Sequence, residues 1–135
     1  MEIIARNIGT PQATKEPQNL KAALEHFTGT SGWYRYSFFS ALLTDGALYL
    51  ADKAGAYWLM DLIASHQTRK LREEPFQVWT LKVLPDREGI VTCEDGNGNK
   101  LAGQKIKYTD FPLSEITLYA VYDSGRIIIL LPSEY

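Results

Sequence analysis

A turn sequence in the second half of the chain constrains the fold more than any other feature. The run Asp95–Asn99 contains Asp-Gly and Asn-Gly in succession, and both dipeptides adopt the positive φ angles that tight hairpin turns require. β-rich segments flank it over 89–94 and 101–108, and in the second of these Ile106 and Tyr108 alternate with lysines. The spacing therefore predicts an antiparallel hairpin with one buried face.

A second hairpin is predicted near the C-terminus. Asp123-Ser124-Gly125 joins β-rich segments over 116–122 and 126–131. The last segment is apolar at every position after its arginine, which is typical of a central strand buried on both faces. A further strand is predicted over 76–84, where alternate apolar residues share one face.

The first half of the chain follows helical spacing instead. A helix is predicted to begin at Asn19 and to end before Gly29, because apolar residues recur along one face between them. The segment 56–67 is the clearest helix, and its apolar stripe places Trp58 in the core. The segment 33–39 is rich in aromatic residues and is predicted to be extended.

The segment 44–54 has two interpretations. Thr44-Asp45-Gly46 resembles a helix start, and the apolar residues after it recur about every 3.6 residues. A strand is the alternative, because apolar side chains also alternate over 48–51. The pattern favours a helix that Gly55 ends or bends.

Helices early and hairpins late predict an α+β fold, in which N-terminal helices pack on one side of a C-terminal antiparallel sheet built from consecutive hairpins. The chain of 135 residues is long enough to form one hydrophobic core without disulfides or a structural metal. Residues 19–135 are therefore predicted to form a single domain. Between Asn7 and Gln18 the sequence has almost no apolar side chains to bury. Residues 1–18 are therefore predicted to be loosely ordered.

Charge and cysteine content narrow the function classes. The formal net charge is −2, whereas a domain that binds nucleic acid normally carries a concentrated positive surplus, so nucleic acid is an unlikely partner. Cys93 is the single cysteine, which excludes an intrachain disulfide and favours a cytoplasmic location. No apolar run in the sequence is long enough to cross a membrane.

The loop over 95–99 also resembles the start of a calcium-binding loop, because Asp95, Asn97 and Asn99 alternate as oxygen ligands. The resemblance fails further along the chain. Lys100 stands where the sharp turn needs glycine, and Ile106 stands where calcium needs a bidentate glutamate. We therefore predict a hairpin loop that binds no metal.

Other cofactor signatures are missing from the sequence. His26, His66 and Cys93 lie in three separate predicted elements, without the spacing of a metal site. No phosphate-binding loop and no dinucleotide-binding motif occurs. Neither a metal nor a cofactor is therefore predicted.

The polar face of the helix over 56–67 is the strongest candidate site. Tyr57, Asp61 and Ser65 stand four residues apart and therefore lie along one line of the helix. Asp61 interrupts an apolar segment, and a buried carboxylate must be paired or hydrogen-bonded. Three interpretations remain: a solvated face, which the pattern favours, a buried polar network, and a ligand site that folding completes with Asp110.

Four segments carry a resemblance to a known family. They are Thr44-Asp45-Gly46, the run Ala54-Gly55-Ala56-Tyr57-Trp58-Leu59 with Asp61, Asp110-Phe111-Pro112-Leu113, and Leu131-Pro132-Ser133-Glu134-Tyr135. In these segments the chain, from about Leu20 to Tyr135, resembles a family of small uncharacterised bacterial and mobile-element proteins known only as a domain of unknown function. The resemblance implies a bacterial or mobile-element origin, and it brings no activity, cofactor or catalytic residue with it.

Three functions remain open. The leading hypothesis is a small non-catalytic bacterial binding or protein-interaction domain, whose partner is an unknown protein or small molecule and which could form a homo-oligomer. The first alternative is a small ligand-processing or hydrolase-like enzyme with Asp61 as its acid or base, assisted by Asp45 or Asp110. The second is a mobile-element accessory protein that inhibits a host factor through acidic and aromatic surface patches.

Overall fold

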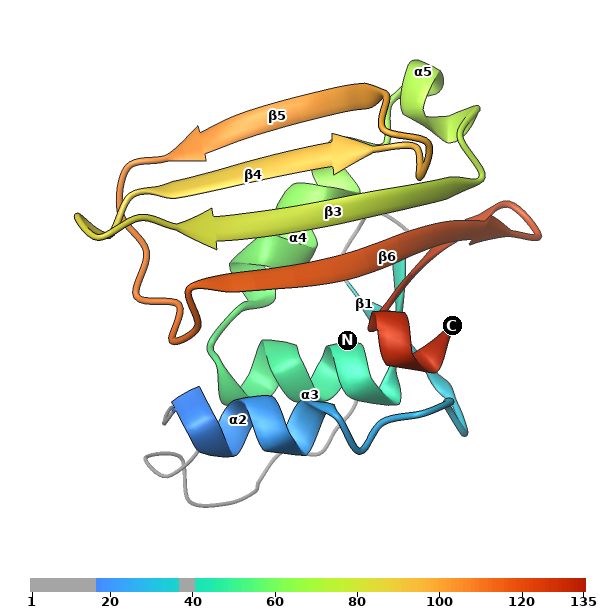
Figure 1. Cartoon of the computed structure of the whole chain (residues 1–135). Coiled ribbons are helices and arrows are strands. Elements are labelled where there is room, and N and C mark those ends of the chain that lie inside the picture. Colours follow the sequence, from blue (N-terminus) through green and yellow to red (C-terminus); the bar gives the residue numbers. More distant parts are fainter. Residues whose placement is uncertain (1–16, 37–40) are drawn as a thin grey trace.

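The computed structural model describes residues 17–36 and 41–135, and these form an α+β fold (Figure 1). The elements run in the order α2 (Pro17–Leu24), β1 (Trp33–Tyr36), β2 (Ala41–Thr44), α3 (Asp45–Lys53), α4 (Tyr57–Ser65), α5 (Arg69–Arg72), β3 (Phe76–Val83), β4 (Gly89–Glu94), β5 (Lys100–Ile106), β6 (Glu115–Asp123), β7 (Arg126–Leu130) and the 3-10 helix η1 (Pro132–Glu134). Within these described residues, no helix has the length and apolar character that spanning a membrane would need.

The strands of the described residues form one seven-stranded sheet in the order β1-β2-β7-β6-β3-β4-β5. Every neighbouring pair is antiparallel except β2 and β7, which are parallel. The prediction of a purely antiparallel sheet made only of C-terminal hairpins is therefore wrong in two respects, because two N-terminal strands join the sheet and one of them pairs in parallel. The apolar strand β7 needs a neighbour on each side, and β2 supplies the second one.

The two predicted hairpins are present. β4 and β5 are joined through Asp95–Asn99, where Gly96 and Gly98 have φ angles of 88° and 93°. β6 and β7 are joined by a turn in which Ser124 and Gly125 have φ angles of 56° and 81°. These left-handed conformations are what tight hairpin turns require, so the local turn chemistry predicted the hairpins correctly.

The ambiguous segment after Thr44 is a helix, as the pattern favoured. The Thr44 side chain accepts a hydrogen bond from the backbone N–H of Ala47 at 3.3 Å and caps the N-terminus of α3. Gly55, with a φ angle of 63°, separates α3 from α4. In α4 the residues Leu59, Leu62 and Ile63 are buried, whereas Trp58, predicted to be in the core, is only half-buried and packs against its edge.

The first described helix begins earlier than predicted. Its first residue is Pro17, so Asn19 lies inside α2 rather than capping it. Residues 17 and 18 belong to α2, and the rest of the segment predicted to be loosely ordered, 1–16, lies outside the described residues. The extended segment predicted over 33–39 is the strand β1 as far as Tyr36, and 37–40 also lie outside the described residues.

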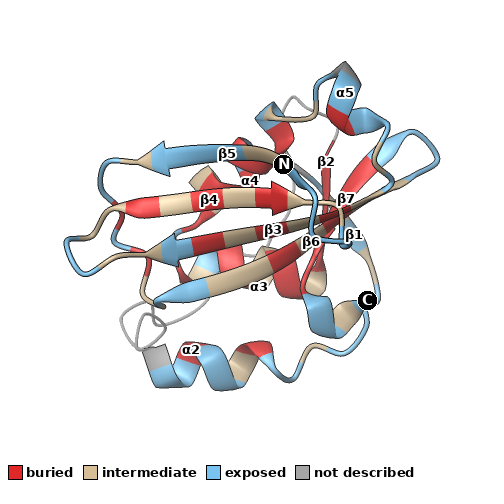
Figure 2. Cartoon of the chain, turned by 45° about the horizontal axis from the view of Figure 1, so that its top comes forward, coloured by how far each residue is buried: buried red, intermediate tan, exposed pale blue. Residues whose placement is uncertain are grey.

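The core lies between the sheet and the helices. In Figure 1, α4 lies behind β3 and β4, while α3 and α2 lie below β6. α3 contacts β2, β7 and α4, and α2 packs on α3. Figure 2 shows the resulting pattern, with buried positions concentrated in β2, β7 and the inward positions of β3 and β4. The largest fully buried side chains include Trp79 and Phe111.

A buried polar network ties the end of α4 to the sheet. Gln77 is fully buried, and its Oε1 accepts hydrogen bonds from Gln67 Nε2 at 2.9 Å and from the Trp79 indole N–H at 3.0 Å. Its Nε2 donates to Gln67 Oε1 at 3.0 Å and to the Leu71 carbonyl at 3.1 Å. The Tyr122 hydroxyl donates to Gln67 Oε1 at 3.0 Å. Gln77 occupies an inward position of β3, where an apolar side chain would be expected. These hydrogen bonds satisfy its buried amide group.

Candidate binding groove

A groove of about 760 Å³ opens between α2, the start of β6 and η1. It brings together segments from both ends of the sequence and from the connection between β5 and β6. Its lining mixes apolar and polar side chains: Gln18, Lys21, Leu24, Glu25, Pro112, Leu113, Ser114, Glu115, Ile116, Thr117, Leu131, Pro132 and Ser133. Concave sites with this mixture are the usual places where proteins bind ligands.

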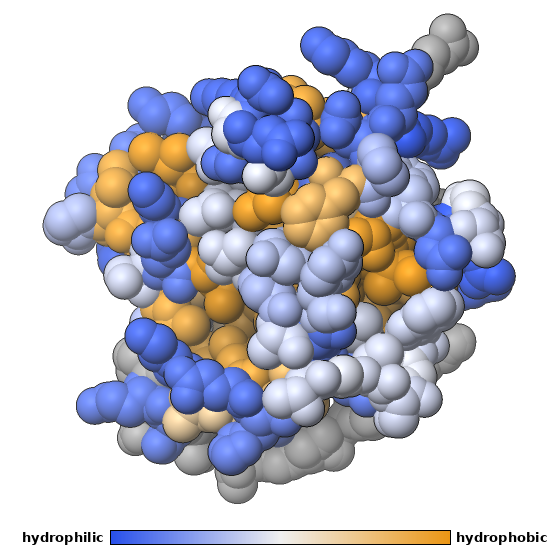
Figure 3. Space-filling view, turned by 45° about the vertical axis from the view of Figure 1, so that its right-hand side comes forward, coloured by the Kyte–Doolittle hydropathy of each residue, from blue (hydrophilic) through white to orange (hydrophobic). Residues whose placement is uncertain are grey.

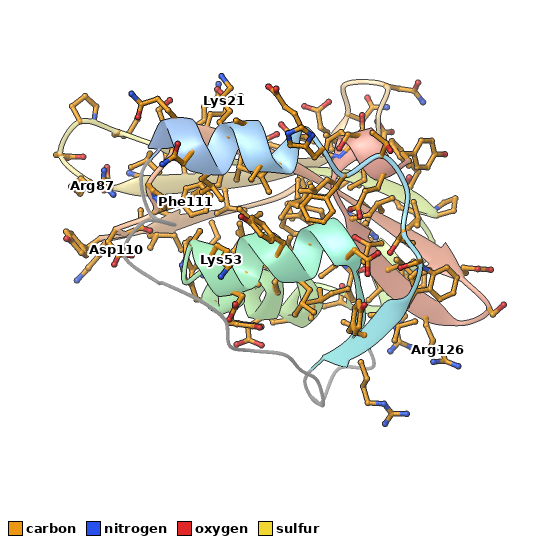
Figure 4. All side chains as sticks on the ribbon, turned by 90° about the horizontal axis from the view of Figure 1, so that it is seen from below. Lys21, Lys53, Arg87, Asp110, Phe111 and Arg126 are labelled. Carbon is orange, nitrogen blue, oxygen red and sulfur yellow. The ribbon has the colours of Figure 1, made fainter. Side chains whose placement is uncertain are left out.

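The helix α2 forms one wall of the groove. Leu20 and Leu24 are buried and anchor the helix on the core. Lys21 and Glu25 are exposed and stand one helical turn apart along the groove. Figure 4 shows Lys21 projecting away from α3.

The connection between β5 and β6 forms a second wall, and Arg87 holds it in place. The Arg87 side chain donates from Nε to the Thr109 carbonyl at 3.0 Å and from Nη2 to the Phe111 carbonyl at 2.8 Å. The Phe111 N–H donates to Thr109 Oγ1 at 3.1 Å, and its ring is fully buried. These contacts fix Pro112 and Leu113 at the groove.

The 3-10 helix η1 forms the third wall and is held by Glu134. One carboxylate oxygen, Oε1, accepts from Thr44 Oγ1 at 2.6 Å and from the Leu131 N–H at 2.9 Å. The other, Oε2, accepts from the Gly46 N–H at 2.8 Å. A carboxylate at the start of α3 satisfies N–H groups that have no partner within the helix and interacts favourably with the helix dipole. Glu134 therefore connects the C-terminus to the first turn of α3.

Asp45 makes a separate junction beside Glu134. Its carboxylate accepts from the N–H of Ser31 at 2.9 Å, from the Ser31 hydroxyl at 3.0 Å and from the Tyr34 hydroxyl at 2.8 Å. Burial alone would raise the pKa of Asp45, but the hydrogen bonds from Ser31, Tyr34 and Thr30 together hold it below the ordinary value. The bond to Asp45 raises the pKa of Tyr34.

None of the four candidate site residues predicted from the sequence lines this groove. Asp61 and Ser65 are exposed on α4, and the Ser65 hydroxyl donates to the Leu62 carbonyl at 2.8 Å. Tyr57 is half-buried and packs against the core. Asp110 is exposed in the β5–β6 connection, beside Arg87 in Figure 4. A binding role for these four residues remains a prediction.

The groove residues were missed because no local spacing joins them. Two of the segments that carry the family resemblance, 110–113 and 131–135, do reach the groove and contain Pro112 and Pro132. Those segments are the one signal in the sequence that pointed to this region.

Potential metal ligands do not gather in the described part of the chain. Over residues 17–36 and 41–135, no group of three or more His, Cys, Asp or Glu side chains is placed to hold a metal. Cys93 is buried, and burial, followed by the charges of Glu74, Glu94 and Asp95, raises the pKa of its thiol to about 12. The Asp95 carboxylate accepts hydrogen bonds within its own loop, from Asn99 Nδ2 and the Asn97 N–H, each at 2.8 Å.

A cluster of aromatic rings lies on the surface near the C-terminus. The ring centroids of Phe76 and Tyr119 are 4.9 Å apart, and that of Tyr135 lies 5.2 Å and 5.5 Å from them. The side chain of Tyr135 is 74% exposed. Figure 3 shows this side of the molecule, where apolar patches alternate with polar side chains.

Comparisons with known proteins agree with the resemblance seen in the sequence. A search of curated protein sequences finds no match. One solved structure that matches is the crystal structure of a protein of unknown function from Enterococcus faecalis, at 19% identity and a TM-score of 0.48, covering 74% of this chain and 97% of that chain. The model of a family of unknown function, DUF6876, matches residues 18–135. The chain therefore belongs to the DUF6876 family, whose function is unknown.

Proposed function

We propose that this chain is a small non-catalytic binding domain whose ligand site is the groove between α2, β6 and η1. The observation that carries the proposal is the construction of the groove. Its walls come from separate segments of the chain, and each is held by defined contacts, namely Leu20 and Leu24 for α2, Arg87 for the β5–β6 connection and Glu134 for η1. Walls held in this way form a site before a ligand arrives, which lowers the cost of binding.

The chemistry of the lining also supports binding rather than catalysis. The hydroxyls of Ser114, Thr117 and Ser133 are accompanied there by no histidine or cysteine among the described residues. A nucleophile normally needs an adjacent base to become reactive. Asp61, the acid of the hydrolase alternative, is exposed on α4 and does not contribute to the groove.

A thermal-shift screen of metabolites and short peptides tests the proposal, because a ligand that binds the native state raises its melting temperature. Two matched variants then locate the site. Ser133→Trp places a bulky ring in the groove, and Ser65→Trp places the same ring on the α4 face that carries Asp61. Both serines are exposed, so both variants should fold.

If the groove is the binding site, the affinity for the ligand should fall by about tenfold or more in Ser133→Trp. In Ser65→Trp it should remain within about twofold of the affinity of the parent. The opposite pattern would place the ligand on the α4 face and overturn the assignment of the groove. A hit that the protein chemically converts would overturn the non-catalytic part of the proposal.

The aromatic cluster of Phe76, Tyr119 and Tyr135 supports a second candidate function, inhibition of a host protein by a mobile-element accessory protein. Tyrosine and phenylalanine are enriched at the centres of protein interfaces. Tyr135 is exposed and can be changed without opening the core. If this surface binds a partner, Tyr135→Ala should weaken that complex while leaving ligand binding in the groove unchanged.

A further inference from the structure

The start of β6 has an unpaired edge at the groove. β6 pairs with β3 along Glu115 to Val121, whereas its pairing with β7 begins only at Tyr119. Among the described strands, Glu115–Leu118 therefore has a neighbour on one side alone. The free edge is about 13 Å long at the usual rise per residue of a strand.

The hydrogen-bond pattern shows which backbone groups are left open. Val83 N–H donates to the Ser114 carbonyl, and Tyr122 N–H donates to the Pro75 carbonyl, so these two residues face β3. In an antiparallel ladder alternate residues face opposite sides. The N–H and C=O groups of Glu115 and Thr117 therefore point away from β3, toward the side where the groove lies.

The sequence explains why β7 does not cover this edge. If β7 continued in register past Leu130, the residue opposite Thr117 would be Pro132, which has no N–H to donate. The Leu131 N–H is already bound to Glu134 Oε1, which draws the chain toward α3. The strand pairing thus ends where the groove begins.

The remaining lining suits the side chains of an extended chain. Leu113, Ile116 and Leu131 offer apolar contacts, while Lys21 and Glu25 line the outer wall. The charged lining residues are Lys21, Glu25 and Glu115, so the groove has no positive surplus with which to hold a phosphate backbone. A peptide backbone, in contrast, supplies both the donors and the acceptors that an open strand edge needs.

We infer that the groove binds an extended peptide segment of a partner protein, which adds as a short strand to the free edge of β6 at Glu115 and Thr117. This inference rests on the proposed function and names its ligand class. Main-chain hydrogen bonds provide the affinity of such an addition, and alternate side chains entering the groove provide its specificity.

Selection from a phage-displayed library of random peptides of about 12 residues supplies the probe. The selected peptides are then synthesised with single N-methyl groups at successive positions, because N-methylation removes one backbone donor and leaves the side chains intact. We expect a period-two effect, in which methylation at every second position weakens binding by about tenfold or more and methylation between them has little effect.

Two protein variants test the same edge from the other side. Thr117→Pro removes an N–H that does not pair with β3, and proline is tolerated at such edge positions. Thr117→Val keeps the N–H and removes only the hydroxyl. Peptide binding should fall by about tenfold or more in Thr117→Pro and remain in Thr117→Val.

The N-methyl series keeps the inference falsifiable if Thr117→Pro does not fold, since it uses the parent protein. Enrichment of no peptide, an N-methyl pattern without a period of two, or competition by a second copy of the chain in place of a peptide would each overturn the inference. A metabolite that binds the parent but not Ser133→Trp, with no peptide selected, would leave the proposed function standing and reject strand addition.

Discussion

Gly46 shows how strongly a single residue controls the wall of the groove. A Cβ atom built on Gly46 would lie 2.5 Å from Leu131 Cδ1 and 2.7 Å from Glu134 Oε1. The absence of a side chain is therefore what lets η1 approach the first turn of α3. The requirement here is close packing, since no positive φ angle is involved at Gly46.

We predict that Gly46→Ala destabilises the fold by about 1–3 kcal/mol, the usual cost of forcing atoms into a packed site. Gly29→Ala is the matched control, because a Cβ at Gly29 would meet nothing within 4 Å. The control should change stability by no more than about 0.5 kcal/mol. Urea denaturation of both variants measures the difference, and equal midpoints would show that η1 is not packed against Gly46.

Gln77 is the second residue on which the fold depends. Replacing it with leucine leaves the Trp79 indole N–H and the Gln67 amide without their buried partner. We predict a loss of about 2–4 kcal/mol, as expected when buried donors and acceptors lose their bonds. Gln104→Leu is the control, because Gln104 is exposed and its side chain bonds to the His66 ring at the surface, at 2.8 Å. A Gln77→Leu protein as stable as the control would contradict a structural role for the network.

At the scale of the elements, the turns could be predicted from the local sequence, whereas the pairing of β2 with β7 could not. The turns at Asp95–Asn99 and Asp123–Arg126 were predictable because glycine and asparagine preferences act within a few residues. The strand β2 was missed because Ala41–Thr44 is short and leads directly into α3. β2 pairs in parallel with β7, whose residues lie far from β2 in the sequence, so no local sequence pattern predicts this pairing.

We expect Asp45, at the start of α3, to link the stability of the fold to pH. Hydrogen bonds hold the pKa of Asp45 below its ordinary value, although burial opposes them. A lowered folded-state pKa contributes stability that is present above the unfolded value, near pH 4, and is lost as the pH falls through the folded value. We therefore predict that Asp45→Asn loses less stability than the parent between about pH 6 and pH 3. Chemical denaturation at both pH values measures this loss, and an equal loss in the two proteins would contradict the prediction.

At the scale of the whole molecule, Glu134 joins the C-terminal 3-10 helix η1 to the start of α3 in the first half of the chain. It binds Thr44 and Gly46 across 90 and 88 residues of sequence, and these contacts hold η1 against the first turn of α3. A search for helix caps by local spacing identifies Thr44 but not a carboxylate from the C-terminus. The groove was not predicted for the same reason, since its walls come from segments that lie far apart in the sequence.

We predict that Glu134→Ala destabilises the domain by about 1–3 kcal/mol, because the hydroxyl of Thr44 and the N–H of Gly46 lose a charged acceptor. Glu115→Ala is the control, an exposed glutamate in the groove that should change stability by no more than about 0.5 kcal/mol. Thermal melts compare the two, and a Glu134→Ala melt that overlays the parent would show that the C-terminus does not support α3.

Locating a bound ligand tests most directly whether the groove is the binding site. The parent protein, labelled with ¹⁵N, is titrated with the tightest binder from the screen of metabolites and short peptides, and its amide shifts are followed by NMR. If the groove binds the ligand, the largest shifts will cluster around Lys21, Thr117 and Ser133, which line it. Shifts that cluster instead on the α4 face around Asp61 would contradict this assignment of the site.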